Sequence, residues 1–217
     1  MKKNLLLTTA FALFMLFNQG ATRAQSPADE LPKFEVGAQF SSLTYSDART
    51  EPGLGARLTY NVNSYFALEA EGNFFPHNAR FRGRNGGRAA QGLFGVKLGK
   101  RYEKFGFFGK VRPGFISFTE GKTEFIPTGG SGFFPFNTRT ERLTHFATDV
   151  GAVIEFYPSR RIVVRFDGGD TVIRYGETTI NSFTFLPDSN TYVPALVTIH
   201  SDTTHNFQFS AGVGFRF

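Results

Sequence analysis

The sequence contains no cysteine or tryptophan and only 2 methionines among its 217 residues. Without cysteine, the chain can form no disulfide, use no thiolate nucleophile and provide no sulfur ligand for zinc or an iron–sulfur cluster. Charged residues are also sparse, at 19% of the chain, and their formal net charge of +6 includes no long run of one sign. This excess is too small to predict a nucleic-acid partner. The mean hydropathy of −0.19 argues against a bundle of membrane-spanning helices.

The first residues have the composition of an export signal. Two lysines precede an apolar stretch from Leu5 to Phe17, which is shorter than the roughly 20 residues of a transmembrane helix. Small residues at Thr22 and Ala24 fit cleavage after Ala24. The sequence therefore predicts a signal peptide at residues 1–24 and one exported domain at residues 25–217.

Beyond the signal peptide, apolar side chains alternate with polar or small ones, which is typical of β-strands with two different faces. Eight segments show this pattern, and a tilted strand of about 9–11 residues is long enough to cross a bilayer. The segments are Phe34–Phe40, Leu54–Tyr60, Phe66–Phe74, Phe94–Leu98, Phe105–Phe115, Phe146–Phe156, Ile162–Phe166 and Phe207–Phe217. Gly168 and Gly169 disturb the alternation in the seventh strand and predict a bulge or kink there.

The connections between the segments alternate in length. Tight connections near 61–65, 99–104 and 157–161 alternate with long ones near 76–88, 119–141 and 176–203. Outer-membrane barrels have this asymmetry between their two rims. The sequence thus predicts an all-β fold, a transmembrane eight-stranded antiparallel up-and-down β-barrel with long extracellular loops and short periplasmic turns.

The last long loop contains two further strand-like runs, Thr178–Phe185 and Thr191–His200. They predict a hairpin that extends the barrel above the membrane. A protruding strand edge of this kind can pair with a strand of a partner.

The polar and small residues that alternate with the apolar ones indicate which face points inward. They are rich in glycine, which suits a narrow lumen, and their charges balance, as expected for charges removed from water. We therefore place the polar set inside and the phenylalanine-rich set against lipid; a soluble barrel with an apolar interior is the alternative. The predicted lumenal network consists of Glu35, Arg57, Glu69, Glu71, Lys97, Lys110, Arg112, Asp149, Glu155, Arg165, Asp167 and Arg216.

One pairing within this network can be predicted from a turn. If the turn between the second and third segments centres on Asn63, Arg57 lies directly opposite Glu69 and forms a salt bridge with it. Glu71 then requires another cation, for which Lys97 is the candidate.

The signal peptide, the eight alternating segments and the ending Phe207–Phe217 resemble the small outer-membrane β-barrels of the OmpA/OmpX type, the outer membrane protein beta-barrel domain. The resemblance implies an integral outer-membrane protein, inserted after export to the periplasm and surrounded by lipids including lipopolysaccharide. It also implies that Phe215 and Phe217 belong to a signal read by the barrel insertion machinery. The aromatic girdles of this family usually contain tryptophan with tyrosine, and here tyrosines near the strand ends would replace it.

Two of the long loops contain candidate contact surfaces. Arg80, Arg82, Arg84 and Arg88 have no acidic residue among them, so their guanidinium groups are candidates for contact with lipopolysaccharide phosphates; a solvated basic loop is the alternative. In the next long loop, apolar side chains at Phe125, Phe133, Phe134 and Phe136 form either a partner surface or a cluster that packs on the loop itself.

No residues are predicted to be catalytic, to bind a cofactor or to ligate a metal. The best local cluster is His200, Ser201, Asp202 and His205, but neighbours on a strand point to opposite faces and form no triad by themselves. We therefore predict a non-enzymatic outer-membrane barrel whose loops serve adhesion, envelope integrity or binding of an extracellular partner. The alternatives are a small porin-like channel and, third, a lipid-modifying enzyme.

Overall fold

The computed structural model describes residues 32–79, 85–127, 136–189 and 191–217, and most of them lie in β-strands. The predicted signal peptide lies outside these residues. In the described part of the chain, no helix has the length and apolarity needed to cross a membrane. The strands are β1 (Phe34–Thr44), β2 (Thr50–Asn61), β3 (Phe66–Ala79), β4 (Gly86–Arg101), β5 (Phe105–Pro127), β6 (Phe136–Phe156), β7 (Ile162–Tyr175), β8 (Thr178–Leu186), β9 (Thr191–Ile199) and β10 (Asp202–Arg216).

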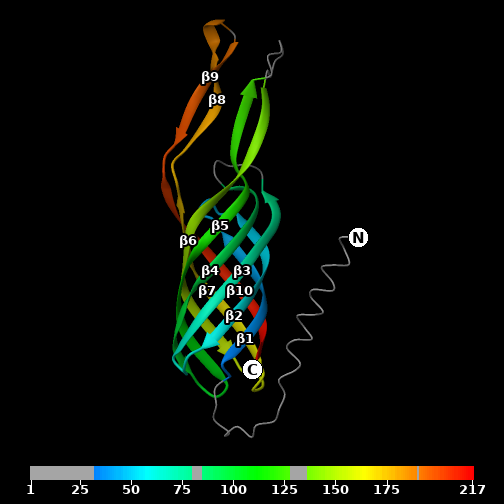
Figure 1. Cartoon of the computed structure of the whole chain (residues 1–217), viewed down its shortest axis with the longest axis vertical. Helices are drawn as coiled ribbons and strands as arrows, with labels where there is room; N and C mark the ends of the chain where they lie inside the picture. The colour runs from blue at the N-terminus through cyan, green and yellow to red at the C-terminus, as the bar shows by residue number, and fades with distance from the viewer. Residues whose placement is uncertain (1–31, 80–84, 128–135, 190) are drawn as a thin grey trace, which may run out of the picture. The chain divides into compact units, whose positions relative to one another are not determined.

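Eight strands close into one antiparallel barrel in the order β1-β10-β7-β6-β5-β4-β3-β2, and β2 pairs back onto β1 (Figure 1). The predicted all-β, eight-stranded antiparallel barrel is therefore confirmed, and each predicted segment lies in a different barrel strand. Closure pairs the backbone groups of neighbouring strands all around the sheet, which is what a lipid environment requires because lipid offers no hydrogen bonds.

Side chains alternate along the barrel strands between the lumen and the exterior. β1 shows the pattern clearly, since Phe34 and Val36 are exposed whereas Glu35 and Gln39 are buried. Charged and amide side chains thus occupy most of the inside and large apolar side chains the outside, while apolar side chains such as Leu43 point inward near the end of the strand. This inverts the arrangement of a water-soluble barrel and matches the predicted direction of the two faces.

The bulge predicted at Gly168 and Gly169 is wrong. The pairing of β7 continues through both residues without a shift, with Gly169 opposite Gly151 of β6. A Cβ atom on Gly151 would lie 2.2 Å from the carbonyl oxygen of Gly168, and one on Gly169 would lie 2.4 Å from that of Val150. These glycines therefore allow the backbones of β6 and β7 to approach closely.

The two ends of the barrel differ. At one end lie the β2–β3, β4–β5 and β6–β7 turns, which span residues 62–65, 102–104 and 157–161. We call this end, which also contains the start of β1 and the end of β10, the terminal rim. At the opposite end, the loop end, register shifts occur between Phe75 and Ala79, between Gly86 and Ala89, and between Phe118 and Lys122.

At the loop end, strands replace much of the predicted long connections. β5 continues to Pro127 and β6 begins at Phe136, so most of the loop predicted at 119–141 is a paired hairpin. Threonines in β6 favour this extension because β-branched side chains suit an extended backbone. The predicted hairpin after β7 is also present, as the separate two-stranded sheet of β8 and β9, and both hairpins project beyond the barrel (Figure 1).

Candidate functional site

The lumen contains all twelve residues of the predicted charge network, and none of them is more than 5% exposed. Arg165 lies at the centre of the network. Its guanidinium donates to both carboxylate oxygens of Asp167, at 2.7 and 2.9 Å, and to both of Glu69, at 2.9 Å for Oε2. Arg165 thus links β7 to β3 on the opposite wall of the barrel, in addition to the contacts that β7 makes with its neighbouring strands.

Arg112 and Lys110 of β5 form the adjoining part of the network. Arg112 donates to Glu71 and Asp149 at 2.5 Å each, and Lys110 lies 2.9 Å from Asp149 and 3.2 Å from Asp167. Each carboxylate here faces at least one cation within hydrogen-bonding distance. The charges removed from water are therefore compensated inside the barrel.

The predicted pairing of Arg57 with Glu69 is wrong. In the ladder between β2 and β3, Arg57 lies opposite Glu71, and Thr59 lies opposite Glu69. Arg57 donates to Gln39 at 2.9 Å and forms an ion pair with Asp167 at 3.7 Å. The reason is local, because the side-chain oxygen of Asn63 accepts hydrogen bonds from the backbone of residues 65 and 66 and moves the centre of the turn by one residue.

Lys97 is also differently placed from the prediction. Its ammonium group pairs with Glu155 and lies 3.6 Å from Glu69, whereas Glu71 is paired with Arg112. The cation that pairs with Glu71 is therefore Arg112 of β5, and not Lys97 of β4 as predicted from the turn.

Arg101, Asn61 and Tyr157 extend the network towards the terminal rim and were not predicted. Arg101 donates to Glu35 at 3.2 Å, to Asn61 at 3.1 Å and to the Tyr157 hydroxyl at 2.9 Å. Burial and the neighbouring carboxylate of Glu155 raise the pKa of Tyr157, so its hydroxyl keeps its proton and donates to Glu155 at 2.8 Å. Arg101 could have been found from the sequence, because it continues the inward parity of Lys97.

A layer of neutral polar side chains lies on the loop-end side of the charges. Asn73 donates to Gln91 at 2.8 Å, Gln91 and Gln208 exchange hydrogen bonds at 3.0 and 3.2 Å, and Thr171 donates to Gln208 at 2.8 Å. These bonds cross between β3, β4, β7 and β10, so they tie opposite walls of the barrel together.

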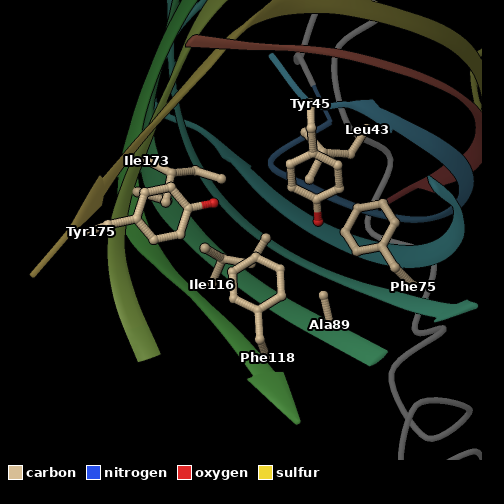
Figure 2. Close-up of a cluster of buried hydrophobic side chains, with 9 residues drawn as sticks. Leu43, Tyr45, Phe75, Ala89, Ile116, Phe118, Ile173 and Tyr175 are labelled. Carbon is tan, nitrogen blue, oxygen red and sulfur yellow. The ribbon is translucent and has the colours of Figure 1, made fainter. Parts of the chain in front are cut away.

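An apolar plug follows nearer the loop end, and Figure 2 shows its side chains converging inside the barrel. Six strands contribute to it, and no side chain in it is more than 4% exposed. It consists of Leu43, Tyr45, Phe75, Ala89, Ile116, Phe118, Ala147, Ile173 and Tyr175. His145 packs beside the plug, with its ring centroid 4.7 Å from that of Tyr175. The lumen is therefore filled by three successive layers, which are charged, amide and apolar.

The loop-end hairpins provide the most exposed apolar surface outside the lipid-facing band. The ring of Phe183 in β8 lies 6.5 Å from that of Phe125 in β5. These two strands and β9 line a pocket of about 420 Å³. Leu196 is 73% exposed, and Phe185 and Leu186 are also exposed.

The histidine cluster of the last loop does not form a joint site. His200 lies 3.4 Å from Glu177, whereas His205 lies 2.5 Å from Asp170 on the outer face of the barrel. Over residues 32–79, 85–127, 136–189 and 191–217, no group of three or more metal-ligating side chains is placed to hold a metal ion.

The remaining predicted contact residues are only partly described. Arg88 is exposed in β4, whereas Arg80, Arg82 and Arg84 lie outside the described residues. Phe133 and Phe134 of the predicted apolar loop cluster also lie outside them.

The last strand is fully described. Phe215 and Phe217 are exposed on the outer face, with their ring centroids 6.2 Å apart. Phe217 is joined to Phe34 by two backbone hydrogen bonds, which close the barrel at the terminal rim.

Comparison with known proteins agrees with this architecture. The profile of the family described as outer membrane protein beta-barrel domain matches residues 9–217. Among curated protein sequences, none matches the chain.

Several solved structures are similar to the chain. The crystal structure of Ail, the attachment invasion locus protein of Yersinia pestis, has 13% identity and a TM-score of 0.43, and the match covers 85% of this chain and 96% of that one. Neisserial surface protein A has 11% identity over 85% and 96% of the two chains, with a TM-score of 0.44. The N-terminal β-barrel domain of Pseudomonas aeruginosa OprF has 11% identity over 84% and 97%, with a TM-score of 0.42. At these identities the likeness concerns the fold alone.

Proposed function

The chain belongs to the outer membrane protein beta-barrel domain family and is an integral outer-membrane protein, and on that premise we propose that it is a closed, non-enzymatic barrel whose activity lies at its loop-end surface. The observation that carries the proposal is the filled lumen. Eight strands leave an interior just wide enough for side chains to fill, and here ion pairs, amides and an apolar plug occupy it in succession. Such a barrel holds its loop-end strands in place outside the membrane and does not conduct solutes through its lumen.

The surface that we assign to binding is formed by β8, β9 and the outer part of β5. Its exposed apolar side chains, including Leu196 and Phe185, are not needed to fill the barrel. Within the described residues, β8 and β9 form a separate two-stranded sheet, so its strand edges are available to an extracellular partner in adhesion or envelope assembly.

An attachment assay tests this assignment. Cells that display the chain, and cells that display a variant in which a short glycine–serine linker replaces Thr178–Ile199, are compared on immobilised fibronectin, laminin and collagen. We expect the deletion to reduce attachment and the double variant Phe185→Ser with Leu196→Ser to reduce it in the same direction. Thr184→Ser is the matched control, and heat-modifiable gel mobility verifies that each barrel is folded. Equal attachment by all four chains would contradict a binding role for the hairpin.

Two further proposals concern the loop arginines and the last strand. We propose that Arg80, Arg82, Arg84 and Arg88 contact the phosphates of lipopolysaccharide, because arginine forks match phosphate oxygens. We also propose that Phe215 and Phe217 are read by the barrel insertion machinery after the signal peptide of residues 1–24 has directed export.

A further inference from the structure

The terminal rim carries a ring of exposed cations. The exposed basic residues are Lys33, Lys100, Lys104, Arg160 and Arg161, and Glu103 is the exposed acidic residue described at this rim. Backbone hydrogen bonds fix these positions on the barrel, since Asn61 donates to Lys33, the backbone of Tyr157 to Lys104 and that of Arg216 to Arg161. Even with the carboxyl group of Phe217 counted, cations exceed anions there.

In the described part of the chain, these cations lack anionic partners. Among the described residues, none of the five forms an ion pair with an acidic side chain; Lys100 instead lies 5.3 Å from the centre of the Tyr102 ring. At the loop end, Arg49, Lys122 and Arg139 lie 3.5, 2.6 and 3.4 Å from glutamates, whereas the exposed Arg88, Arg142 and Arg174 form no ion pair among the described residues. The terminal rim therefore differs in that all five of its exposed cations are unpaired there.

The barrel mouth adds to this positive potential. Arg101 lies just inside the rim, 3.2 Å from Glu35 and 3.5 Å from Glu155, and the guanidinium of Arg216 lies 4.3 Å from the centre of the Tyr157 ring. Nη1 of Arg101 and Nε of Arg216 are both buried, and neither has a hydrogen-bond partner among the described residues. Arg101 and Arg216 thus place two further cations just inside the exposed ring.

The height of the ring relative to the membrane follows from the aromatic side chains. Tyr65, Tyr102 and Phe217 are 58%, 44% and 51% exposed at the same rim. Tyrosine rings of membrane proteins collect at the level of the lipid headgroups. Lysine and arginine side chains beside such a girdle extend to that level while their aliphatic parts remain against apolar surface.

We propose that the terminal rim binds anionic glycerophospholipids through their headgroup phosphates. The cations lie at headgroup height at the start of β1 and around the β4–β5 and β6–β7 turns, so the nearest molecules of complementary charge are lipids. A basic side chain close to an anionic lipid surface adds measurably to membrane affinity, and salt weakens the effect. The ring would therefore gather anionic lipid around the end of the barrel that carries the short turns.

Spin-labelled lipids test the proposal. The chain of residues 25–217, which retains Asp29 and Glu30, is refolded in phosphatidylcholine vesicles. The motionally restricted fraction of spin-labelled phosphatidylglycerol is then compared with that of spin-labelled phosphatidylcholine. We expect a preference of roughly twofold or more for phosphatidylglycerol at low salt, falling towards one at high salt.

Two charge-matched variants locate the effect. The terminal-rim variant combines Lys33→Gln, Lys104→Gln, Arg160→Gln and Arg161→Gln. The loop-end variant combines Lys122→Gln, Arg139→Gln, Arg142→Gln and Arg174→Gln. We expect the preference to be lost in the first variant and kept in the second, with both folded by heat-modifiable mobility. No preference in the unmodified chain, or equal preference in the two variants, would overturn the proposal without affecting the question of conductance.

Discussion

Replacement of Arg165 by methionine tests the lumenal network at its centre. The Arg165 side chain is fully buried, donates to Glu69 and Asp167, and lies 3.5 Å from Glu155. The substitution retains much of the apolar volume but leaves these buried carboxylates with one cation fewer. Removal of one partner from a buried ion pair costs about 3–5 kcal/mol, and we expect Arg165→Met to lower the free energy of unfolding by about that amount.

A second variant separates charge from packing. Arg165→Met combined with Glu69→Gln restores the charge balance while leaving the same methionine in the lumen. Contacting residues in one network typically show coupling energies of about 0.5–3 kcal/mol, so we expect the double variant to recover part of the loss. If the defect were one of packing, the double variant would be no more stable than the single one.

Urea titration of the protein refolded in detergent micelles gives these values. Far-ultraviolet circular dichroism is the suitable signal because the chain has no tryptophan. Arg160→Met, at an exposed position in the β6–β7 turn, is the control and should leave the midpoint unchanged. If Arg165→Met had the same midpoint as this control, the network would not stabilise the barrel and the reasoning would be refuted.

Three further predictions concern the wall of the barrel. Gly151→Ala should destabilise the barrel by roughly 1–3 kcal/mol in the same titration, because its Cβ would lie 2.2 Å from the carbonyl oxygen of Gly168. Gly168→Ala, which meets nothing within 4 Å, should be neutral, and equal effects would contradict the close approach of β6 and β7. Cysteines at Leu58 and Ala70, which are directly opposite, should form a disulfide on oxidation, whereas cysteines at Leu58 and Leu68 should not; the reverse outcome would show that the turn centres on Asn63. Deletion of Phe217 should reduce surface assembly in cells far more than it lowers the urea midpoint of refolded protein. Normal assembly would contradict the insertion signal and would show that Phe217 is only a residue of the aromatic girdle.

The barrel could be predicted from the sequence because one physical rule acts on every strand. Lipid outside and polar side chains inside impose a period of two, and glycines at inward positions mark a narrow lumen. The twelve charged residues of the network follow the same parity, so their common burial was predictable. The ion-pair partners of these residues were not predictable, because contacts such as Arg165 with Glu69 cross the barrel. Such contacts depend on the tilt and stagger of the strands, which cannot be derived from a local sequence pattern.

The apolar plug was missed for a related reason. Phe75 and Phe118 lie on the inward parity of their strands, where the alternation changes from polar to apolar side chains towards the loop end. Assigning every large apolar residue to lipid overlooks such a change. The signal was present in adjacent apolar pairs such as Phe74 with Phe75, since neighbours on a strand point to opposite faces and both faces must then be apolar.

The claim that the lumen is closed is tested most directly by single-channel recording. The refolded protein is inserted into planar lipid bilayers in concentrated potassium chloride, and the current is followed at a constant holding potential. Because ion pairs, amides and the apolar plug fill the lumen in succession, we expect insertion to produce no conductance steps above the bilayer baseline. Reproducible steps from protein whose folding is verified by heat-modifiable mobility would contradict the account and establish a channel.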